Sequence, residues 1–437
     1  MHTPTHHTLT PPEFVTIDNA DVYLVGGAVR DQLLDIPVKD RDWLVVGATP
    51  KQMMALGYEE VGIDFPVYLH PTTHEEYALA RTERKSSPGY TGFTFQLEQV
   101  TLEDDLLRRD LTINAIAMDS SGALIDPYNG LDDLNNRVLR HVSPAFVEDP
   151  LRVLRVARFS AQLGAFGFTL ADDTRQLMND IVDSGELDYL QSERIWQETA
   201  TALRTDYPQH FVKTLRDAGA LRHIFPELDA LFGVPQTAKY HPEIDTGIHT
   251  LMVMEQSALL SPELSVRFAA MMHDIGKGKT PEAEWPSHKM HEQRSYDMLK
   301  DFYKRIPTPK QCQEVANKVA KFHLLPHIAF ELRVQTILKL FKQLDAYRKP
   351  KVFDLFLLSC IADSKGRTGF EDKPTPTIDY LRACFEASRN INANNVFQLH
   401  SDSERPQGKE LGQRIDELRM DAISTIKQQW AQQKSTQ

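Results

Sequence analysis

A short apolar strand that runs directly into a glycine pair and then into a helix most restricts the fold of this chain. Val22–Val25 is β-branched and aromatic, Gly26-Gly27 follows at once, and residues 28–34 continue with helical spacing. Glycines at such a turn let backbone N–H groups approach a phosphate, and the start of the helix adds a favourable dipole. The turn predicts a phosphate site to which Arg30 adds charge, although a glycine pair alone often serves backbone geometry only.

Two aspartates stand two positions apart at the start of the next predicted strand. Asp40 and Asp42 flank Arg41, and the apolar run 43–46 follows. Because side chains two positions apart in a strand point to the same side, these carboxylates are expected to lie close together. They repel each other unless a cation neutralises them, and Mg²⁺ prefers such oxygen ligands. The pair predicts a divalent metal site, with a solvated turn as the alternative.

The rest of the chain changes character near Phe146. Before it, strands are expected at 42–46, 66–69, 77–80 and 115–118, and a helix is expected to start at Thr49-Pro50 with Thr49 as N-cap. After it, apolar residues recur at helical spacing almost throughout, which predicts a nearly all-α remainder. Residues 1–20 lack any such pattern and are expected to form a flexible N-terminal extension.

The length, charge and cysteine content of the chain exclude several classes of protein. A chain of 437 residues suggests about three structural units. The formal charge of −12 excludes a general basic field, so any contact with nucleic acid must use a local patch. Three widely spaced cysteines indicate reduced thiols. No apolar run approaches the roughly 18 residues of a membrane helix, so no membrane partner and a cytoplasmic location are expected.

Two arginine-rich blocks follow the predicted strands. In Arg108-Arg109-Asp110, the guanidinium of Arg109 is suited to bidentate contact with a phosphate. Asp149-Pro150 then begins a predicted helix in which three arginines follow at three-residue steps along one flank: Arg152, Arg155 and Arg158. Three arginines with no acid between them repel one another unless they face phosphates or RNA, with a plain solvated surface as the alternative.

Together these motifs resemble the head of the class II tRNA nucleotidyltransferases, a family of the polymerase-β-like superfamily. The resemblance rests on residues 26–31, 39–42, 108–115 and 126–130. It implies that Asp40 and Asp42 hold Mg²⁺ for a two-metal phosphoryl transfer that releases pyrophosphate, with Glu76 as a candidate third carboxylate and Glu75 nearly equivalent. It assigns binding of ATP and CTP to Gly27, Arg30, Arg109, Asp149, Arg152, Arg155 and Arg158.

The resemblance assigns Asp149 and Arg152 to recognition of the incoming base. Cytosine and adenine both present an amino donor beside a ring-nitrogen acceptor, which a carboxylate and a guanidinium complement. Uracil and guanine present the reverse pattern, and mispairing costs about 1–3 kcal/mol for each buried group. The expected activity is therefore template-independent addition of CCA to the 3′ end of tRNA from CTP and ATP, with no DNA partner.

A second set of candidate ligands lies in the helical half. His273-Asp274 ends the apolar stretch 266–272, with His249 before it and Asp363 after it. The set resembles the HD phosphohydrolase pattern, in which helices direct such ligands to a divalent metal, and its mixed donors fit Ni²⁺, Mn²⁺ or Co²⁺. The resemblance implies that His273 and Asp274 are catalytic and that Lys277 contacts phosphate.

The expected reaction of this second site is hydrolysis of phosphomonoesters or 2′,3′-cyclic phosphates, as a 2′,3′-cyclic phosphodiesterase, 2′-nucleotidase and phosphatase. Such a reaction would repair damaged tRNA ends before nucleotides are added. His288, His291 and His323 are candidates to extend the site, although each is more readily explained as an ordinary surface or core histidine. A fold that only packs, without catalysis, is the alternative.

The resemblance spans residues 22 to about 422 and implies an α+β protein. Its expected parts are a polymerase-β-like nucleotidyltransferase head with a small mixed sheet at 21–145, an all-α neck and RNA-binding body at 146–228, an all-α HD domain at 229–375, and a helical tail at 376–437. The HD pair favours CCA addition over a bacterial poly(A) polymerase, which shares the head motifs but lacks that domain. A non-catalytic RNA-binding protein is a third hypothesis, and a monomer or weak homo-oligomer is expected.

Overall fold

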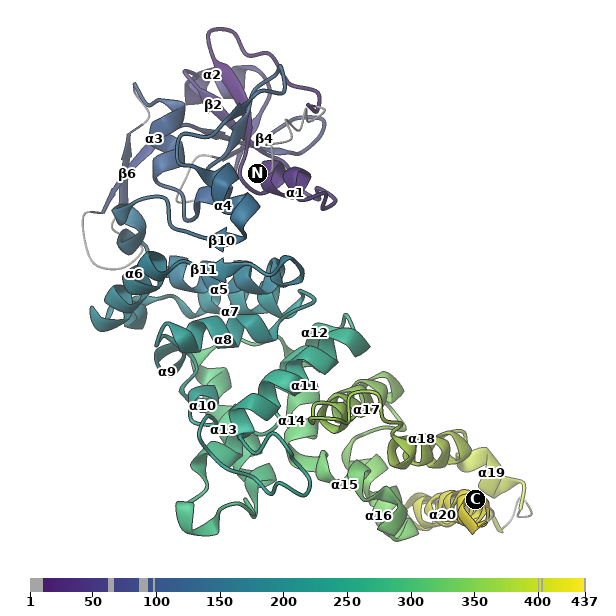
Figure 1. Ribbon diagram of the computed structural model, residues 1–437. Coiled ribbons are helices and arrows are strands. Elements are labelled where there is room, and N and C mark those ends of the chain that lie inside the picture. The colour runs from purple at the N-terminus through teal and green to yellow at the C-terminus, as the bar shows by residue number, and fades with distance from the viewer. Residues whose placement is uncertain are drawn as a thin grey trace. The chain divides into compact units, whose positions relative to one another are not determined.

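The computed structural model describes residues 11–61, 67–85, 93–96, 99–399, 401 and 404–435. The chain divides into two compact units, one of residues 1–199 and 213–224 and the other of residues 200–212 and 225–437. A mixed sheet forms the centre of the first unit, and helices build the second (Figure 1). The α+β class is therefore confirmed, and each unit is described by itself.

Within the described residues, the main sheet has seven strands in the order β3-β4-β5-β2-β1-β8-β9. Strand β1 (Asp21–Val25) pairs antiparallel with β2 (Asp42–Val46), and β2 pairs parallel with β5 (Glu76–Leu79). The other strands are β3 (Glu59–Val61), β4 (Val67–Leu69), β6 (Thr82–Lys85), β7 (Phe93–Gln96), β8 (Ala117–Met118), β9 (Leu124–Ile125), β10 (Val138–Leu139) and β11 (Thr169–Leu170).

Most of the predicted elements of this unit are confirmed. Strands β2 and β5 agree with the expected ranges within one residue. Helix α2 (Pro50–Ala55) begins as predicted, because Thr49 Oγ1 accepts a hydrogen bond from the backbone N–H of Gln52 at 3.3 Å. Of the strand expected at 115–118, only Ala117–Met118 forms a strand. A 3₁₀ helix at Thr112–Asn114 precedes it. Pro66 lies outside the described residues.

Part of the expected N-terminal extension packs on the sheet. The ring of Phe14 meets that of Trp43 edge-on, with centroids 4.8 Å apart, and Ile17 is buried. This corrects the prediction that residues 1–20 form a flexible extension, because these side chains gain free energy by leaving water. The correction applies to residues 11–20, since residues 1–10 lie outside the described part.

Besides α2, the helices that lie wholly or partly in the first unit are α1 (Gly27–Leu33), α3 (Leu102–Leu107), α4 (Gly130–Asn136), α5 (Leu151–Gln162), α6 (Asp172–Asp183), α7 (Ser192–Leu203), α8 (Gln209–Asp217) and α9 (Leu221–Ile224). Helix α5 starts one residue after Pro150, and the side chain of Asp149 accepts a hydrogen bond from the N–H of Leu151 at 3.0 Å. Asp149 thus accepts from a backbone N–H that has no partner within the helix.

The second unit is built around helix α12 (Leu264–Met272), in which every residue after Leu264 is buried. A helix that is buried on all sides needs neighbours all round, and α12 contacts α11, α14 and α17. Its helices are α10 (Pro226–Asp229), α11 (Thr246–Leu260), α12, α13 (His291–Arg305), α14 (Lys310–Phe322), α15 (Leu324–His327), α16 (Val334–Gln343), α17 (Pro350–Lys365), α18 (Pro376–Ser388), α19 (Ala393–Phe397) and α20 (Gly408–Ser435).

Two expectations from composition can be compared with this fold. Cys312, Cys360 and Cys384 are buried and unpaired, as predicted for reduced thiols. Burial raises the pKa of Cys312 and of Cys384 to about 11, which makes these thiols unreactive. Among the described helices, none combines the length and the apolar character that crossing a membrane requires.

Candidate active sites

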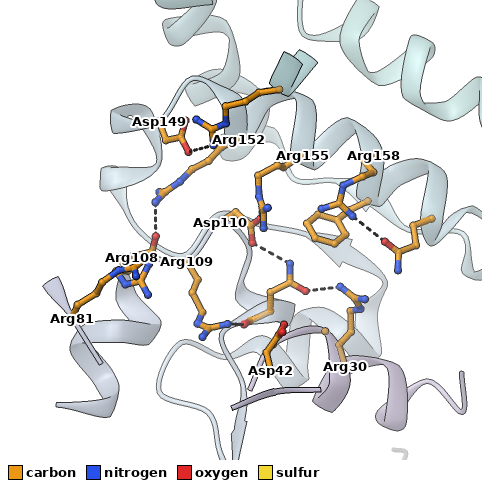
Figure 2. A pocket seen from close by; sticks show the side chains of 16 residues that line it. Arg30, Asp42, Arg81, Arg108, Arg109, Asp110, Asp149, Arg152, Arg155 and Arg158 are labelled. Carbon is orange, nitrogen blue, oxygen red and sulfur yellow. Dashed lines mark hydrogen bonds and ion pairs between the residues drawn. The ribbon is translucent and has the colours of Figure 1, made fainter. Parts of the chain in front are cut away.

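A cavity of about 550 Å³ lies in the first unit beside the glycine turn (Figure 2). Eight arginines and three aspartates line it, and this excess of positive charge favours a ligand with several negative charges, such as a triphosphate. All the predicted nucleotide-binding residues meet here. The lining comprises Gly26, Gly27, Arg30, Asp42, Arg81, Arg108, Arg109, Asp110, Asn114, Asp149, Arg152, Arg155, Arg158, Phe159, Gln162 and Arg194.

The first glycine of the turn makes room for an arginine. Gly26 has a φ of +71°, a conformation that favours glycine. A Cβ atom at this position would lie only 2.8 Å from Nη1 of Arg109. The glycine therefore has two physical roles, the left-handed turn before α1 and the close approach of the Arg109 guanidinium.

A chain of polar contacts fixes two of the cavity arginines (Figure 2). Arg30 Nη1 donates to Asn114 Oδ1 at 2.6 Å, and Asn114 Nδ2 donates to Asp110 Oδ1 at 3.0 Å. Arg155 Nε donates to the other oxygen of Asp110 at 2.7 Å. Burial alone would raise the pKa of Asp110, but the charge of Arg155 and the hydrogen bond from Asn114 hold it well below its usual range.

The three arginines of α5 find partners on other elements. Arg155 pairs with Asp110, and Arg158 Nε lies 2.6 Å from Glu198 Oε2. Arg152 donates to the backbone oxygens of Ala145 and Arg108. The prediction that their repulsion requires phosphates or RNA was therefore wrong in its physical premise. The compensating acids lie far away in sequence, and proximity on α5 alone could not reveal them.

The structure separates the two candidates for the third carboxylate. In the β2–β5 pair, Glu76 lies in register with Asp42. Glu75 instead accepts hydrogen bonds from Arg41 Nη1 at 3.0 Å and Trp43 Nε1 at 2.8 Å. Glu76 is thus the one of the two that joins the aspartates.

The electrostatics of these carboxylates fit a bound cation. Burial raises the pKa of Asp42, an effect that Arg109 opposes and Asp40 reinforces. Burial also raises the pKa of Glu76, and the charges of Asp42 and Asp40 raise it further. Oxygen donors that repel one another in this way are stabilised by a divalent ion such as Mg²⁺. Of these three carboxylates, only Asp42 is among the described residues that line the cavity.

Buried histidines and aspartates meet in the second unit, and four of them are the predicted HD ligands. Nε2 of His249 lies 3.1 Å from Oδ1 of Asp363, and Nε2 of His273 lies 3.2 Å from Oδ2 of Asp274. The residues come from α11, from the end of α12 and from α17. His249, His273 and Asp363 form one group whose ligand atoms lie within 4.8 Å of one another.

An adjoining group of buried ligands consists of Asp274, His291 and His323. The Nε2 atoms of His291 and His323 lie 3.3 and 3.4 Å from Oδ1 of Asp274. These two histidines are therefore buried rather than on the surface, and they lie where candidate ligands would extend the site. His288 does not join the group, since its Nε2 contacts the backbone oxygen of Pro235 at 2.8 Å.

Two further side chains complete the surroundings of the cluster. Lys277 Nζ lies 2.6 Å from Asp274 Oδ2 and donates to Gln236 Oε1 at 2.9 Å. His327 Nε2 lies 2.6 Å from Asp363 Oδ2, and the sequence analysis missed this residue. The sequence offered one signal for it, because His327 follows His323 by four positions, a spacing that places two side chains on one face of a helix.

The central atoms of the cluster fit a metal ion. Within the described part of the chain, Nε2 of His273 and Oδ1 of Asp274 are buried and make no hydrogen bond of good geometry, although ion-pair contacts of 3.2 to 3.4 Å surround them. Such atoms carry a desolvation cost unless a cation or proton satisfies them. Mixed imidazole and carboxylate donors suit a borderline divalent ion. The residues present therefore fit the divalent metal ion that an HD site requires.

Three family profiles match successive parts of the chain. The profile described as the poly A polymerase head domain matches residues 22–140. The profile described as the probable RNA and SrmB-binding site of polymerase A matches residues 167–232. The HD domain profile matches residues 246–351, the segment that holds five of the six ligand residues described above.

Similar proteins cover almost the whole chain. The multifunctional CCA protein of Hahella chejuensis (strain KCTC 2396) is 55% identical over 407 residues, which cover 93% of this chain and 95% of that protein. A CCA-adding enzyme solved in complex with ATP has a TM-score of 0.64 at 19% identity, covering 93% of this chain and 86% of that chain. The Thermotoga maritima CCA-adding enzyme complexed with tRNA has a TM-score of 0.58 at 19% identity, covering 94% and 90%. At such identities the solved structures show a shared fold.

Proposed function

Because this chain belongs to the multifunctional CCA proteins, we propose that it adds CCA to the 3′ end of tRNA from CTP and ATP, with release of pyrophosphate. The observation that carries this proposal is the cavity that eight arginines line together with the Asp42 carboxylate. A nucleoside triphosphate needs this excess of cations, and transfer of its α-phosphoryl group needs a metal-binding carboxylate beside them.

In the head, Asp40, Asp42 and Glu76 would hold Mg²⁺, which supplies positive charge for activating a hydroxyl nucleophile and stabilising a pyrophosphate leaving group. The residues themselves perform the binding and orientation. Arg109 beside Gly26 and Arg30 beside Asn114 hold the phosphates in place, since their guanidinium groups are fixed before the ligand arrives. Arg155 and Arg158 add charge from α5.

Selection between bases falls to Asp149 and Arg152, which both line the cavity. One oxygen of Asp149 accepts a hydrogen bond from the N–H of Leu151, and this fixes the direction of the carboxylate. Its other oxygen lies 3.9 Å from Arg194 Nη2. A carboxylate and a guanidinium held in this way accept the shared hydrogen-bond pattern of cytosine and adenine and oppose that of uracil and guanine.

The tRNA partner would contact the helical part that follows the head. The profile match at 167–232 and the tRNA complex of the Thermotoga maritima enzyme support this assignment. The proposed head ends at residue 145, the helical body at residue 228 and the HD domain at residue 375, and the tail follows.

We further propose that the HD domain hydrolyses phosphomonoesters and 2′,3′-cyclic phosphates at tRNA 3′ ends. His249, His273, Asp274 and Asp363 would hold Ni²⁺, Mn²⁺ or Co²⁺, which supplies a nucleophilic water at neutral pH. Lys277, whose Nζ is 2.6 Å from Asp274, carries the charge for a phosphate contact. The buried atoms of His273 and Asp274 that make no hydrogen bond of good geometry support this second function.

A poly(A) polymerase is the alternative for the head, because the matching head profile carries that name. The HD match and the identity of 55% to a multifunctional CCA protein favour CCA addition. The two activities differ in their use of CTP and in the point at which addition stops.

A single set of proteins tests both functions. The parent chain, Asp40→Ala and His273→Ala are incubated with a tRNA transcript that ends at the discriminator base, Mg²⁺, CTP and ATP. We expect the parent and His273→Ala to add C, C and A and then stop, and Asp40→Ala to add nothing. A long ladder of A without use of CTP would establish poly(A) polymerase, and no addition by any protein would support a binding role.

The second half of the experiment uses the same proteins on a transcript with a 2′,3′-cyclic phosphate end and added Ni²⁺. We expect the parent and Asp40→Ala to open the cyclic phosphate and His273→Ala to leave it intact. Equal hydrolysis by His273→Ala and the parent would contradict the proposed HD activity without affecting the conclusion for the head.

A further inference from the structure

A carboxylate outside the HD ligand set contacts one of its histidines. Oε1 of Glu243 lies 3.0 Å from Nδ1 of His249, and its side chain is only 2% exposed. The same oxygen lies 3.1 Å from Nδ1 of His241. Glu243 belongs to the loop before α11, and two residues later Asp245 caps the first turn of that helix by accepting from the N–H of Ile248 at 2.9 Å.

Both ring nitrogens of His249 lie within hydrogen-bond distance of acceptors, and Nε2 faces Asp363 Oδ1 at 3.1 Å. Nδ1 faces two acceptors, Glu243 Oε1 and the backbone oxygen of Gly366 at 2.9 Å. With a cation bound on the Nε2 side, Nδ1 is the nitrogen that carries the ring proton, and these two acceptors stabilise that tautomer.

The second acceptor depends on a glycine. Gly366 follows α17, and a Cβ atom there would lie 2.5 Å from Cγ2 of Val253 on α11. The absence of a side chain lets the end of α17 come close enough for its carbonyl to reach His249. The loop before α11, through Glu243, and the end of α17, through Gly366, thus both contact the His249 imidazole.

The oriented nitrogen points into the ligand group. Nε2 of His249 lies 3.1 Å from Oδ1 of Asp363, and both belong to the group that His273 completes. A carboxylate or carbonyl on the far nitrogen fixes the ring tautomer of a metal-binding histidine and makes the near nitrogen a stronger donor.

We propose that Glu243 is a positioning residue of the HD site, which directs Nε2 of His249 toward a divalent cation. The proposal rests on the metal-dependent function proposed above and adds a residue to it. Glu243 acts through His249 and touches no reacting atom. Its contact with Nδ1, the side of the ring that faces away from Asp363, separates it from the ligands.

The experiment measures Co²⁺ binding, because this ion reports its own coordination in the visible spectrum. Every protein is the full-length chain with Asp42→Ala, so that the head does not contribute its metal site. The variants are Glu243→Ala, Glu243→Gln and, as a matched control, Glu314→Gln, which removes a glutamate that pairs with Lys349 on another surface. Equilibrium dialysis gives affinity and stoichiometry, and thermal melting verifies folding.

We expect Glu243→Ala to weaken Co²⁺ binding by about 10- to 100-fold and to reduce the visible absorption of the bound ion. Glu243→Gln should lose less than Glu243→Ala, since its amide oxygen still accepts from Nδ1. The control should bind as the parent does, and all chains should melt cooperatively.

Three results would overturn the proposal, and they differ from one another. Unchanged affinity and spectrum in Glu243→Ala would remove the positioning role alone. Loss of one bound ion in both Glu243 variants, at unchanged affinity for the rest, would make Glu243 a ligand instead. A parent chain without Co²⁺ binding would refute the proposed metal-dependent function itself.

Discussion

Asp110 and Arg155 form an ion pair with 2.6 Å between Oδ2 and Nη2, and it joins the loop after α3 to helix α5. The side chain of Asp110 is 5% exposed, and it also accepts hydrogen bonds from Asn114 and from the backbone N–H of Leu111. One carboxylate therefore holds groups on both sides of the arginine-lined cavity.

The first prediction concerns this carboxylate. Asp110→Ala should lower the free energy of unfolding by about 1–3 kcal/mol, because the buried donor of Asn114 loses its acceptor and Arg155 loses its partner. It should also raise the KM for CTP and ATP together, since the cavity arginines lose their fixed directions. Denaturant unfolding and initial rates measure the two effects.

Asp173→Ala serves as the control for this prediction, because it breaks an exposed pair in which Arg140 Nη1 lies 2.7 Å away. Its cost should stay below about 1 kcal/mol. Equal unfolding energies for the two variants would contradict the role assigned to Asp110.

The second prediction concerns base selection. Asp149→Ala should accept UTP and GTP more readily relative to CTP and ATP, by about 10-fold or more, because one of the two groups that oppose the wrong bases is removed. Ratios of kcat/KM for the four nucleotides measure this change, with Asp173→Ala as the matched control. Discrimination as sharp as in the parent would refute the assignment of Asp149.

The third prediction follows from the raised pKa of Asp42. A carboxyl whose pKa is higher in the folded protein than in the unfolded chain destabilises the metal-free fold once it is ionised, and this penalty disappears as the pH falls through the folded-state pKa. Asp42→Asn should therefore raise the melting temperature of the metal-free protein at neutral pH, by up to about 2 °C. It should also reduce nucleotide addition by on the order of 10³-fold.

Melting curves with and without Mg²⁺ check this third prediction. The parent should gain stability from Mg²⁺ and Asp42→Asn should gain less, because one oxygen ligand is lost. At acid pH the difference between the metal-free proteins should vanish. A metal-free variant that melts below the parent at neutral pH would show that Asp42 is not under electrostatic strain.

The fourth prediction uses a glycine beside the HD ligands. A Cβ atom at Gly276 would lie 2.3 Å from the backbone oxygen of His291 and 2.5 Å from the N atom of Ser295. Gly276→Ala should displace α13 and cost about 1–3 kcal/mol or more. Hydrolysis of a cyclic phosphate should fall sharply, while CCA addition should continue.

Gly412→Ala is the matched control, since a Cβ atom there has no described neighbour within 4 Å and helix α20 tolerates alanine well. It should leave both activities unchanged. If Gly276→Ala behaved in the same way, the close packing of the HD turn against α13 would be irrelevant to the site.

The fifth prediction concerns the histidines that the sequence analysis undervalued. His323→Ala removes a nitrogen that lies 3.4 Å from Asp274 Oδ1, so Co²⁺ binding at the HD site should weaken by about 10-fold or more. His210→Ala, outside all three groups of candidate ligands among the described residues, should bind as the parent does. Wild-type binding by His323→Ala would reduce this residue to a packing role.

Local patterns in the sequence were sufficient for the parts of the fold that depend on near neighbours. The glycine turn before α1, the start of α2 at Thr49 and the strand after Asp42 all follow from interactions within a few residues. The helical spacing after Phe146 predicted a nearly all-α remainder for the same reason, and among the described residues β11 is the one strand in it. The resemblance to a known family then indicated which of these elements carry chemistry.

The partners of the charged and buried groups could not be predicted, because they come from distant parts of the chain. Glu198 compensates Arg158, the β2–β5 register selects Glu76 over Glu75, and Glu243 reaches His249 together with the carbonyl of Gly366.

The sequence by itself determined the elements, the two chemical motifs and the family, since these depend on local spacing. Only the tertiary structure decided which acid pairs with which base and which histidines lie with the candidate metal ligands. Electrostatic and hydrogen-bond energies depend on distance in space, and the folding of the chain sets that distance.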